Sequence, residues 1–229
     1  MGIFSKSASS ELKAFLETED LDDLVKARER VQHLDENDIK KIRSILEKWD
    51  KPQEVSNLLF HPSLIPEDIR FSSLLKGLEE RDNLYYLLAS IAGLQGMEEE
   101  FSEEEKIIIK EHLISALEIT GGVLAARASV TIVGFLSIGD ANRMFKFLSH
   151  PEEVVRLNIL SWLIETLEET DVETFALMLQ SSEVPEDIQA DTIEKFREHL
   201  RKKESGETDF STMPLYAYIP NLNEVLKRA

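Results

Sequence analysis

The sequence predicts an all-α protein, a right-handed α-α superhelix of stacked helical hairpins. Apolar residues recur with helical spacing, as Ile39, Ile42, Ile45 and Trp49 do, and strand-like alternation is scarce. Glycine and proline are rare, at 9 and 7 of 229 residues, and they cluster where helices should stop. A short motif around proline also recurs along the chain. We therefore expect helices and short turns over residues 10–203, and no sheet.

The proline motif occurs in three copies. The segment Ile65 to Ile69 reads Ile-Pro-Glu-Asp-Ile, Val184 to Ile188 reads Val-Pro-Glu-Asp-Ile, and Ser149 to Arg156 is a looser copy. Each copy follows a short segment ending in bulky apolar residues and precedes a longer apolar helix. Pro151 and Pro185 are 34 residues apart, the length of one helical hairpin. Hairpins repeated at this interval are typical of an α-solenoid.

Capping residues indicate where the helices begin. A side chain that accepts a hydrogen bond from the first turn favours a helix start, and proline in the first turn costs no hydrogen bond. The segment Ser102 to Glu105 also has the spacing of a capping box. Candidate N-caps are Ser10, Asp20, Asp35, Asn37, Ser102, Asp140 and Asp171, and first-turn prolines are Pro66, Pro151 and Pro185.

The motif resembles the turn of the HEAT-repeat family. In that family helix A ends at a turn that often carries proline, an acidic residue follows, and helix B begins with an apolar residue and an arginine. Ser149 to Arg156 has this order, Phe60 to Arg70 has a longer version of it, and Val184 to Gln189 has glutamine in place of the arginine. The resemblance covers residues 52–203 and implies B helices that line a concave surface. The Trp-Leu-Gly-Tyr spacing of tetratricopeptide repeats is absent.

The chain divides into three expected regions. Residues 1–51 form N-terminal helices that cap the same solenoid, and residues 52–204 form the HEAT-like repeats. Residues 205–229 form a polar linker and an apolar tail, rich in large side chains from Phe210 to Leu222. A terminal repeat leaves an apolar face open, so we expect the tail to dock there. The alternative is that the tail binds another protein.

Charge and composition exclude several classes of protein. The 44 acidic residues outnumber the 26 basic ones and give a net charge of −18, which opposes binding to nucleic acid or to an anionic membrane. The absence of cysteine excludes disulfides, cysteine-ligated metals and thiol catalysis. The most apolar run, Val123 to Ile138, is too short to span a bilayer, so it indicates a buried helix. We expect a cytoplasmic protein without membrane insertion.

No motif predicts catalysis, a metal or a cofactor. The five histidines lack the i, i+3 or i+4 spacing of a helical zinc pair. A phosphate-binding loop and a nucleophile elbow are absent from the sequence. The arginines near the starts of B helices, Arg70, Arg127 and Arg156, are expected to pair with acids of the preceding turn, such as Asp68 or Glu153. Trp49 and Trp162 are expected in the core, and one of Tyr85 and Tyr86 at the surface.

These observations favour a non-catalytic interaction scaffold or adaptor that binds a protein partner with a basic segment. Alignment of the B helices by their prolines places Ser72, Glu79 and six further polar residues on equivalent positions of one concave face, which gains acids toward the C-terminal end. The alternative is an enzyme of the lyase or glycosylase type that uses the groove as an active site, which the net charge and the missing motifs oppose. The candidate partner-binding residues are Asn158, Ser161, Glu165, Asp191, Glu194 and Glu198.

Overall fold

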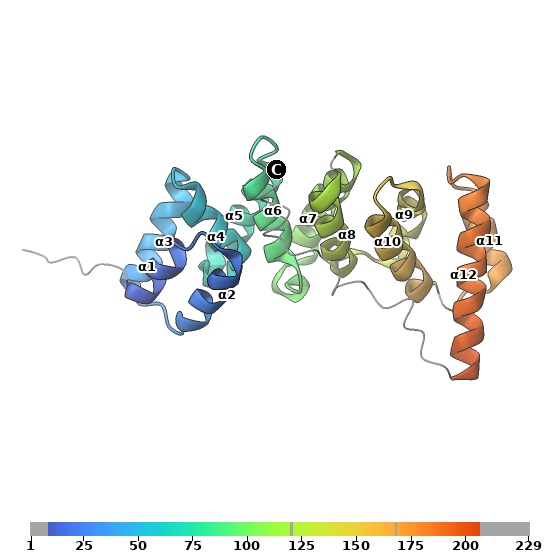
Figure 1. Ribbon diagram of the computed structural model, residues 1–229, viewed down its shortest axis with the longest axis horizontal. Helices are drawn as coiled ribbons and strands as arrows, with labels where there is room; N and C mark the ends of the chain where they lie inside the picture. Colours follow the sequence, from blue (N-terminus) through green and yellow to red (C-terminus); the bar gives the residue numbers. More distant parts are fainter. Residues whose placement is uncertain (1–8, 120, 168, 207–229) are drawn as a thin grey trace, which may run out of the picture. The chain divides into compact units, whose positions relative to one another are not determined.

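The computed structural model of the protein describes residues 9–119, 121–167 and 169–206. Over this part of the chain the structure consists of helices and turns without a strand, which confirms the all-α prediction (Figure 1). The chain forms two compact units, and the division between His112 and Leu113 falls inside α7 (Glu103–Ile119). The boundary expected after residue 51 lies within the first unit. The tail expected over residues 205–229 lies, beyond Gly206, outside the described residues.

The first unit is organised around one helix that is buried over residues 55–59. Its elements before α7 are α1 (Ser10–Leu16), α2 (Leu21–Arg30), α3 (Glu36–Lys48), α4 (Pro52–Phe60), η1 (Pro62–Leu64), α5 (Glu67–Glu79), α6 (Leu84–Leu94) and η2 (Glu98–Glu100). The central helix is α4, which packs against α1, α3, α5 and α6. Val55, Leu58 and Leu59 of α4 are completely buried, so this helix supplies the middle of the core.

Two buried polar side chains hold α1 at both of its ends. Asp38 of α3 accepts a hydrogen bond from the backbone N–H of Ser9 at 2.7 Å. Asn57 of α4 donates through Nδ2 to the carbonyl oxygens of Phe15 and Thr18, at 3.0 and 2.9 Å. Helix ends leave main-chain groups without partners inside the helix. Because a helix as short as α1 is marginal alone, it depends on these bonds and on its packing against α4.

The helices α4, α5 and α6 approach one another closely at two glycines. A Cβ atom on Gly93 of α6 would lie 1.9 Å from the carbonyl oxygen of Leu59. A Cβ atom on Gly77 of α5 would lie 2.0 Å from Oγ of Ser90. Both distances are far below van der Waals contact, so the helices pack here only because no side chain is present. Gly93 is the stricter position, because its neighbour is main chain and cannot rotate away.

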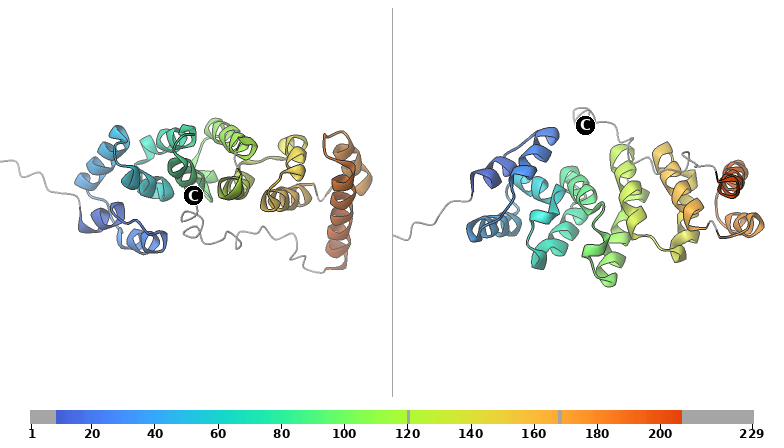
Figure 2. Two further views of the ribbon diagram at one scale, coloured as in Figure 1. Left: turned by 45° about the horizontal axis from the view of Figure 1, so that its top comes forward. Right: turned by 90° about the horizontal axis from the view of Figure 1, so that it is seen from below.

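The second unit is also built around one central helix. After α7 its elements are α8 (Gly122–Ile132), η3 (Val133–Phe135), η4 (Ile138–Asp140), α9 (Ala141–Met144), η5 (Phe145–Ser149), α10 (Glu153–Thr166), α11 (Val172–Gln180) and α12 (Glu186–Ser205). The central helix, α10, packs against α8, α9, η3, η5 and α12. Every side chain of α10 from Asn158 to Ile164 is buried. The hairpin of α11 and α12 is visible in both views of Figure 2.

The turn between α7 and α8 is capped by residues from a later part of the chain. Gly121 is the N-cap of α8 but has no side chain, and Gly122 has φ of 57°. The Glu152 carboxylate accepts a hydrogen bond from the N–H of Gly122 at 2.8 Å. Nδ1 of His150 accepts from the N–H of Glu152 at 3.0 Å, and Nε2 lies 3.1 Å from the Leu117 carbonyl oxygen. The neutral ring therefore carries its proton on Nε2 and donates it to Leu117.

Most of the predicted helix starts are confirmed. Asp20, Asp35 and Asp171 cap α2, α3 and α11, and Ser102 and Glu105 form the reciprocal bonds of a capping box. The cap of α1 is Ser9, one residue before the predicted Ser10. The Asp140 side chain accepts from Ser137 and does not cap α9. None of the described helices is both long and apolar enough to cross a membrane.

The aromatic residues singled out in the sequence differ in burial. Trp162 is 7% exposed, which confirms its place in the core. Trp49 is only half-buried, because it ends α3 with φ of 55°, an uncommon conformation for a bulky residue. Its ring packs edge-on against Tyr86, with centroids 5.3 Å apart, and lies 4.2 Å from Nζ of Lys76. Tyr85 is 58% exposed and Tyr86 only 4%, so one of the two tyrosines faces solvent as predicted.

Candidate partner-binding surface

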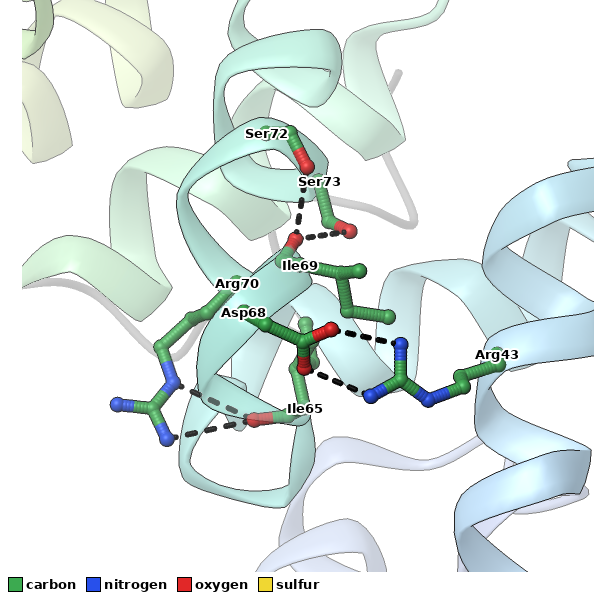
Figure 3. A network of polar contacts seen from close by, with 7 residues as sticks. All are labelled: Arg43, Ile65, Asp68, Ile69, Arg70, Ser72 and Ser73. Carbon is green, nitrogen blue, oxygen red and sulfur yellow. Dashed lines mark hydrogen bonds and ion pairs between the residues drawn. The ribbon is translucent and has the colours of Figure 1, made fainter.

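The three proline turns share one side-chain contact, made by the fourth residue of the helix that follows. That residue donates to the carbonyl oxygen five positions earlier, which belongs to the residue just before the N-cap. The pairs are Arg70 with Ile65 at 3.3 Å, Arg156 with Pro151 at 2.9 Å, and Gln189 with Val184 at 2.6 Å. Figure 3 shows the first of them. The prolines themselves precede the first helical turn: Pro66 and Pro185 are N-caps, and Pro151 comes one residue earlier still.

The expected pairing of Arg70 and Arg156 with acids of the preceding turn is wrong. Asp68 accepts two hydrogen bonds from Arg43 of α3, at 3.0 and 2.7 Å, on the side away from Arg70 (Figure 3). This bond lowers the pKa of the Asp68 carboxyl. Arg70 instead forms an ion pair with Glu100 of η2 at 2.9 Å. The arginines bind main-chain carbonyls because the turn brings these oxygens to the fourth helical position.

Arg127 of α8 is in a different setting. Its helix begins after the Gly-Gly turn, and Arg127 is the sixth residue of the helix rather than the fourth. The side chain is half-buried, and loss of solvent lowers the pKa of its guanidinium. Its pairing with an acid of the preceding turn stays a prediction.

Two of the six predicted partner-binding residues are buried. Asn158 is 4% exposed and Ser161 is 8% exposed, so their placement on an exposed face of α10 is wrong. Nδ2 of Asn158 donates to Oγ of Ser129 in α8 at 2.9 Å, which satisfies a buried amide. The physical reason is that α8 packs against α10 where solvent was expected.

The other four predicted residues, Glu165, Asp191, Glu194 and Glu198, are exposed. The three on α12 each pair with a base within the same helix: Asp191 with Lys195 at 2.8 Å, Glu194 with Arg197, and Glu198 with Lys202 at 3.0 Å. Exposed pairs of this kind stabilise a helix by about 0.2–0.5 kcal/mol each. In α12 six acids stand against five bases, a net charge of −1. The helix is therefore much less acidic than its carboxylates suggest.

Asp191 also lines a recess between α10 and α12, inside the second unit. The recess has a volume of about 190 Å³, below the roughly 300–1,000 Å³ of small-molecule sites, and it is large enough for one side chain of a partner. Its lining combines charged and apolar residues: Leu148, Glu153, Arg156, Leu157, Leu160, Ile188, Asp191, Thr192 and Lys195. Glu198 lines a second, more open recess with Arg201, Lys202 and Ser205.

The sequence interpretation missed Glu153, Arg156 and Lys195 as residues of this surface. The signal that points to two of them is the composition of α10. Its apolar residues, Val155, Ile159, Leu160, Trp162, Leu163 and Ile164, point in all directions around the helix. This pattern is typical of a helix buried on all sides, so the exposed side chains of α10 lie at its two ends: Glu153 in the first turn, close to the half-buried Arg156, and Glu165 in the last.

The described residues do not contain a group of three or more His, Asp or Glu side chains that could hold a metal ion. Comparisons with protein-family models, with curated proteins and with solved structures found no match.

Proposed function

We propose that the protein is an interaction scaffold or adaptor, built as a right-handed superhelix of HEAT-like hairpins. It binds a protein partner that carries a basic segment. The contact surface is formed by the accessible carboxylates Glu165, Asp191, Glu194 and Glu198, together with the recess between α10 and α12. In this proposal the protein binds its partner without catalysing a reaction.

The shared contact of the three proline turns carries this proposal. Arg70, Arg156 and Gln189 occupy the same helical position, and each binds the carbonyl oxygen five positions earlier, although the sequences of the three turns differ. This equivalence supports the interpretation of α5, α10 and α12 as corresponding B helices of repeated hairpins. Repeats of this kind form extended binding surfaces in α-solenoids.

The recess suggests how a basic segment is held. Leu157 and Ile188 can cover the aliphatic stem of a lysine or arginine, while Glu153 and Asp191 attract its charged end. Lys195 and Arg156 line the same recess and oppose such a charge, so the contribution of any one pair is small. We therefore expect affinity from several such contacts, with a strong dependence on salt.

The experiment is affinity capture with the full chain at low salt, followed by mass spectrometry and a binding measurement on the captured protein. Charge reversal at Glu165, Glu194 and Glu198 should weaken binding and slow association at low salt, with a smaller effect at high salt, because ions screen the attraction. Unchanged binding of the triple variant at low salt would contradict the proposed surface.

A matched control separates this surface from net charge. Glu17, Glu29 and Glu47 are exposed acids of the first unit near the C-terminal ends of α1, α2 and α3. Lysine at these positions is favourable to the helix dipole, and the triple reversal changes the total charge by the same amount. It should leave partner binding close to that of the unaltered protein. An equal loss in both variants would mean that only the net charge matters.

A further inference from the structure

The outer face of α7 carries exposed apolar side chains, as does the start of α6, where Leu84 and Tyr85 are 53% and 58% exposed. Ile107 and Ile108 are adjacent, and their side chains are 56% and 41% exposed. Isoleucine is a weaker helix former than Ala, Lys or Glu, and burial normally compensates for this. Single exposed apolar residues are common in proteins. Two on one helix face, each only about half-buried, indicate a surface that something else covers.

The charges around the two isoleucines define one face. Glu104, Ile107, Ile108 and Glu111 have the spacing i, i+3, i+4 and i+7, which places them on one side of a helix. All four side chains are exposed, while Ile109 on the opposite side is completely buried. The residue order on this outer face is therefore acid, isoleucine, isoleucine, acid.

The surrounding segment is strongly negative. Residues 98–111 contain seven glutamates and two lysines, a net charge of −5. One lysine, Lys106, already pairs with Glu103 at 2.8 Å. By contrast, the 20 residues of α12 carry a net charge of only −1. The field at α7 therefore attracts a cationic segment more strongly than the face predicted from the sequence.

We propose that the outer face of α7 is a docking site for an amphipathic helix of a partner protein. That helix presents leucine, isoleucine or valine side chains to Ile107 and Ile108, with lysine or arginine on their flanks to meet Glu104 and Glu111. Its apolar stripe packs between the isoleucines as in an ordinary helix pair, and its bases take the flanking positions. The inference rests on the proposed role in partner binding but uses a different surface.

The test uses the full chain and a defined probe. The probe is a synthetic peptide of about 18 residues, with leucines at i, i+3, i+4 and i+7, lysines on the two flanks of that stripe and alanines, the best helix formers, elsewhere. Its binding is measured by fluorescence anisotropy. Replacing both isoleucines (I107S and I108S) should weaken binding by about tenfold or more, and E104Q with E111Q should reduce its salt dependence. Unchanged affinity of the isoleucine variant would overturn the inference.

Serine is the matched replacement, because its helix propensity is close to that of isoleucine. The melting temperature should therefore stay within about 2 °C, and a larger fall would show that the isoleucines serve the fold. The control variant carries serine at Ile138 and Leu177, two exposed apolar residues of the second unit, at 67% and 66% exposure. It should bind the probe normally. Equal weakening in both variants would mean that the probe binds apolar surface without preference.

Three further outcomes would overturn the inference. If a peptide of residues 207–229 added to the full chain displaces the probe, this chain supplies the occupant, and the partner helix is overturned. If reversal at Glu165, Glu194 and Glu198 abolishes probe binding while the α7 variant retains it, the α7 site fails and the proposed function stands. If the unaltered chain binds neither the probe nor any captured partner, both proposals fail.

Discussion

Nε2 of Gln189 donates a hydrogen bond to the carbonyl oxygen of Val184 at 2.6 Å. This bond takes the place of the one that an arginine makes in the other two proline turns. The amide is shorter and uncharged, yet it reaches the same main-chain group from the same helical position. Glutamine in place of arginine in this copy of the motif is therefore a conservative change, because either side chain can donate to that carbonyl.

Removal of this contact should destabilise each hairpin. We expect Gln189→Ala to lower the free energy of unfolding by about 1 kcal/mol, and Arg156→Ala by about 2 kcal/mol because its donor is charged. Gln189→Arg should preserve stability. Urea unfolding measures these values, with the exposed Arg197→Ala as control, expected to stay within about 0.5 kcal/mol. A loss at Arg197 as large as at Gln189 would contradict the assignment.

Gly93→Ala should be strongly destabilising. The added methyl group would meet the carbonyl oxygen of Leu59, where a Cβ atom would lie at 1.9 Å. We expect a net cost of about 1–3 kcal/mol, despite the better helix propensity of alanine. Gly139→Ala is the control, because its nearest neighbour would be Oγ of Ser137 at 3.8 Å. Thermal unfolding compares the melting temperatures of the two variants. Equal melting temperatures would refute the close approach of α6 and α4.

Acid should destabilise the first unit through His61. Burial, together with the nearby charge of Arg28, lowers the pKa of His61 to about 4. The unfolded chain, with a histidine pKa of about 6.5, binds more protons in this interval. Stability therefore falls as pH decreases from about 6.5 to 4, by about 1–2 kcal/mol after allowing for partial solvent screening.

Substitution of His61 isolates this effect from the protonation of carboxylates. The His61→Phe variant also keeps a ring against Phe15, whose centroid lies 5.6 Å from that of His61. The difference in stability between the two proteins should change between pH 7 and pH 4.5, in favour of the variant at the lower pH. Parallel curves over this range would show that His61 is protonated equally easily in both states.

Trp162→Ala tests the central position of α10. The indole is 7% exposed and lies among side chains that are buried on all sides. Truncation of such a residue costs about 3–5 kcal/mol, because the cavity collapses only in part. Chemical denaturation provides the measurement. A loss below about 1 kcal/mol would mean that the ring contributes little to the core.

The helical content and many helix starts could be predicted because they depend on local chemistry. Asp20, Asp35 and Asp171 cap their helices through bonds within four residues, and such patterns are readable in a sequence. The burial of Asn158 could not be read in this way. It depends on α8, which lies about thirty residues earlier, as the bond from Asn158 to Ser129 shows. A polar residue gives no sequence signal that a distant helix will cover it.

The candidate surface was predictable to a similar extent. The exposure of Glu194 and Glu198 follows from the helical period of α12, which buries Thr192 and Phe196 on its other side. The in-helix pairing of these acids was also present in the sequence as acids followed by bases at i+3 and i+4. A count of the carboxylates alone does not reveal this pairing. The exposure of Ile107 and Ile108 was hidden because their apolar character favours the core.

The cap that Glu152 provides to Gly122 has a consequence for the order of synthesis. The two residues are 30 positions apart, and a ribosome adds about 5–20 residues per second. The carboxylate that completes the first turn of α8 is therefore made about 1.5–6 seconds after the glycine that it caps. Until then the N–H of Gly122 at the start of α8 lacks this acceptor. The acceptor is supplied later by Glu152, the residue just before α10.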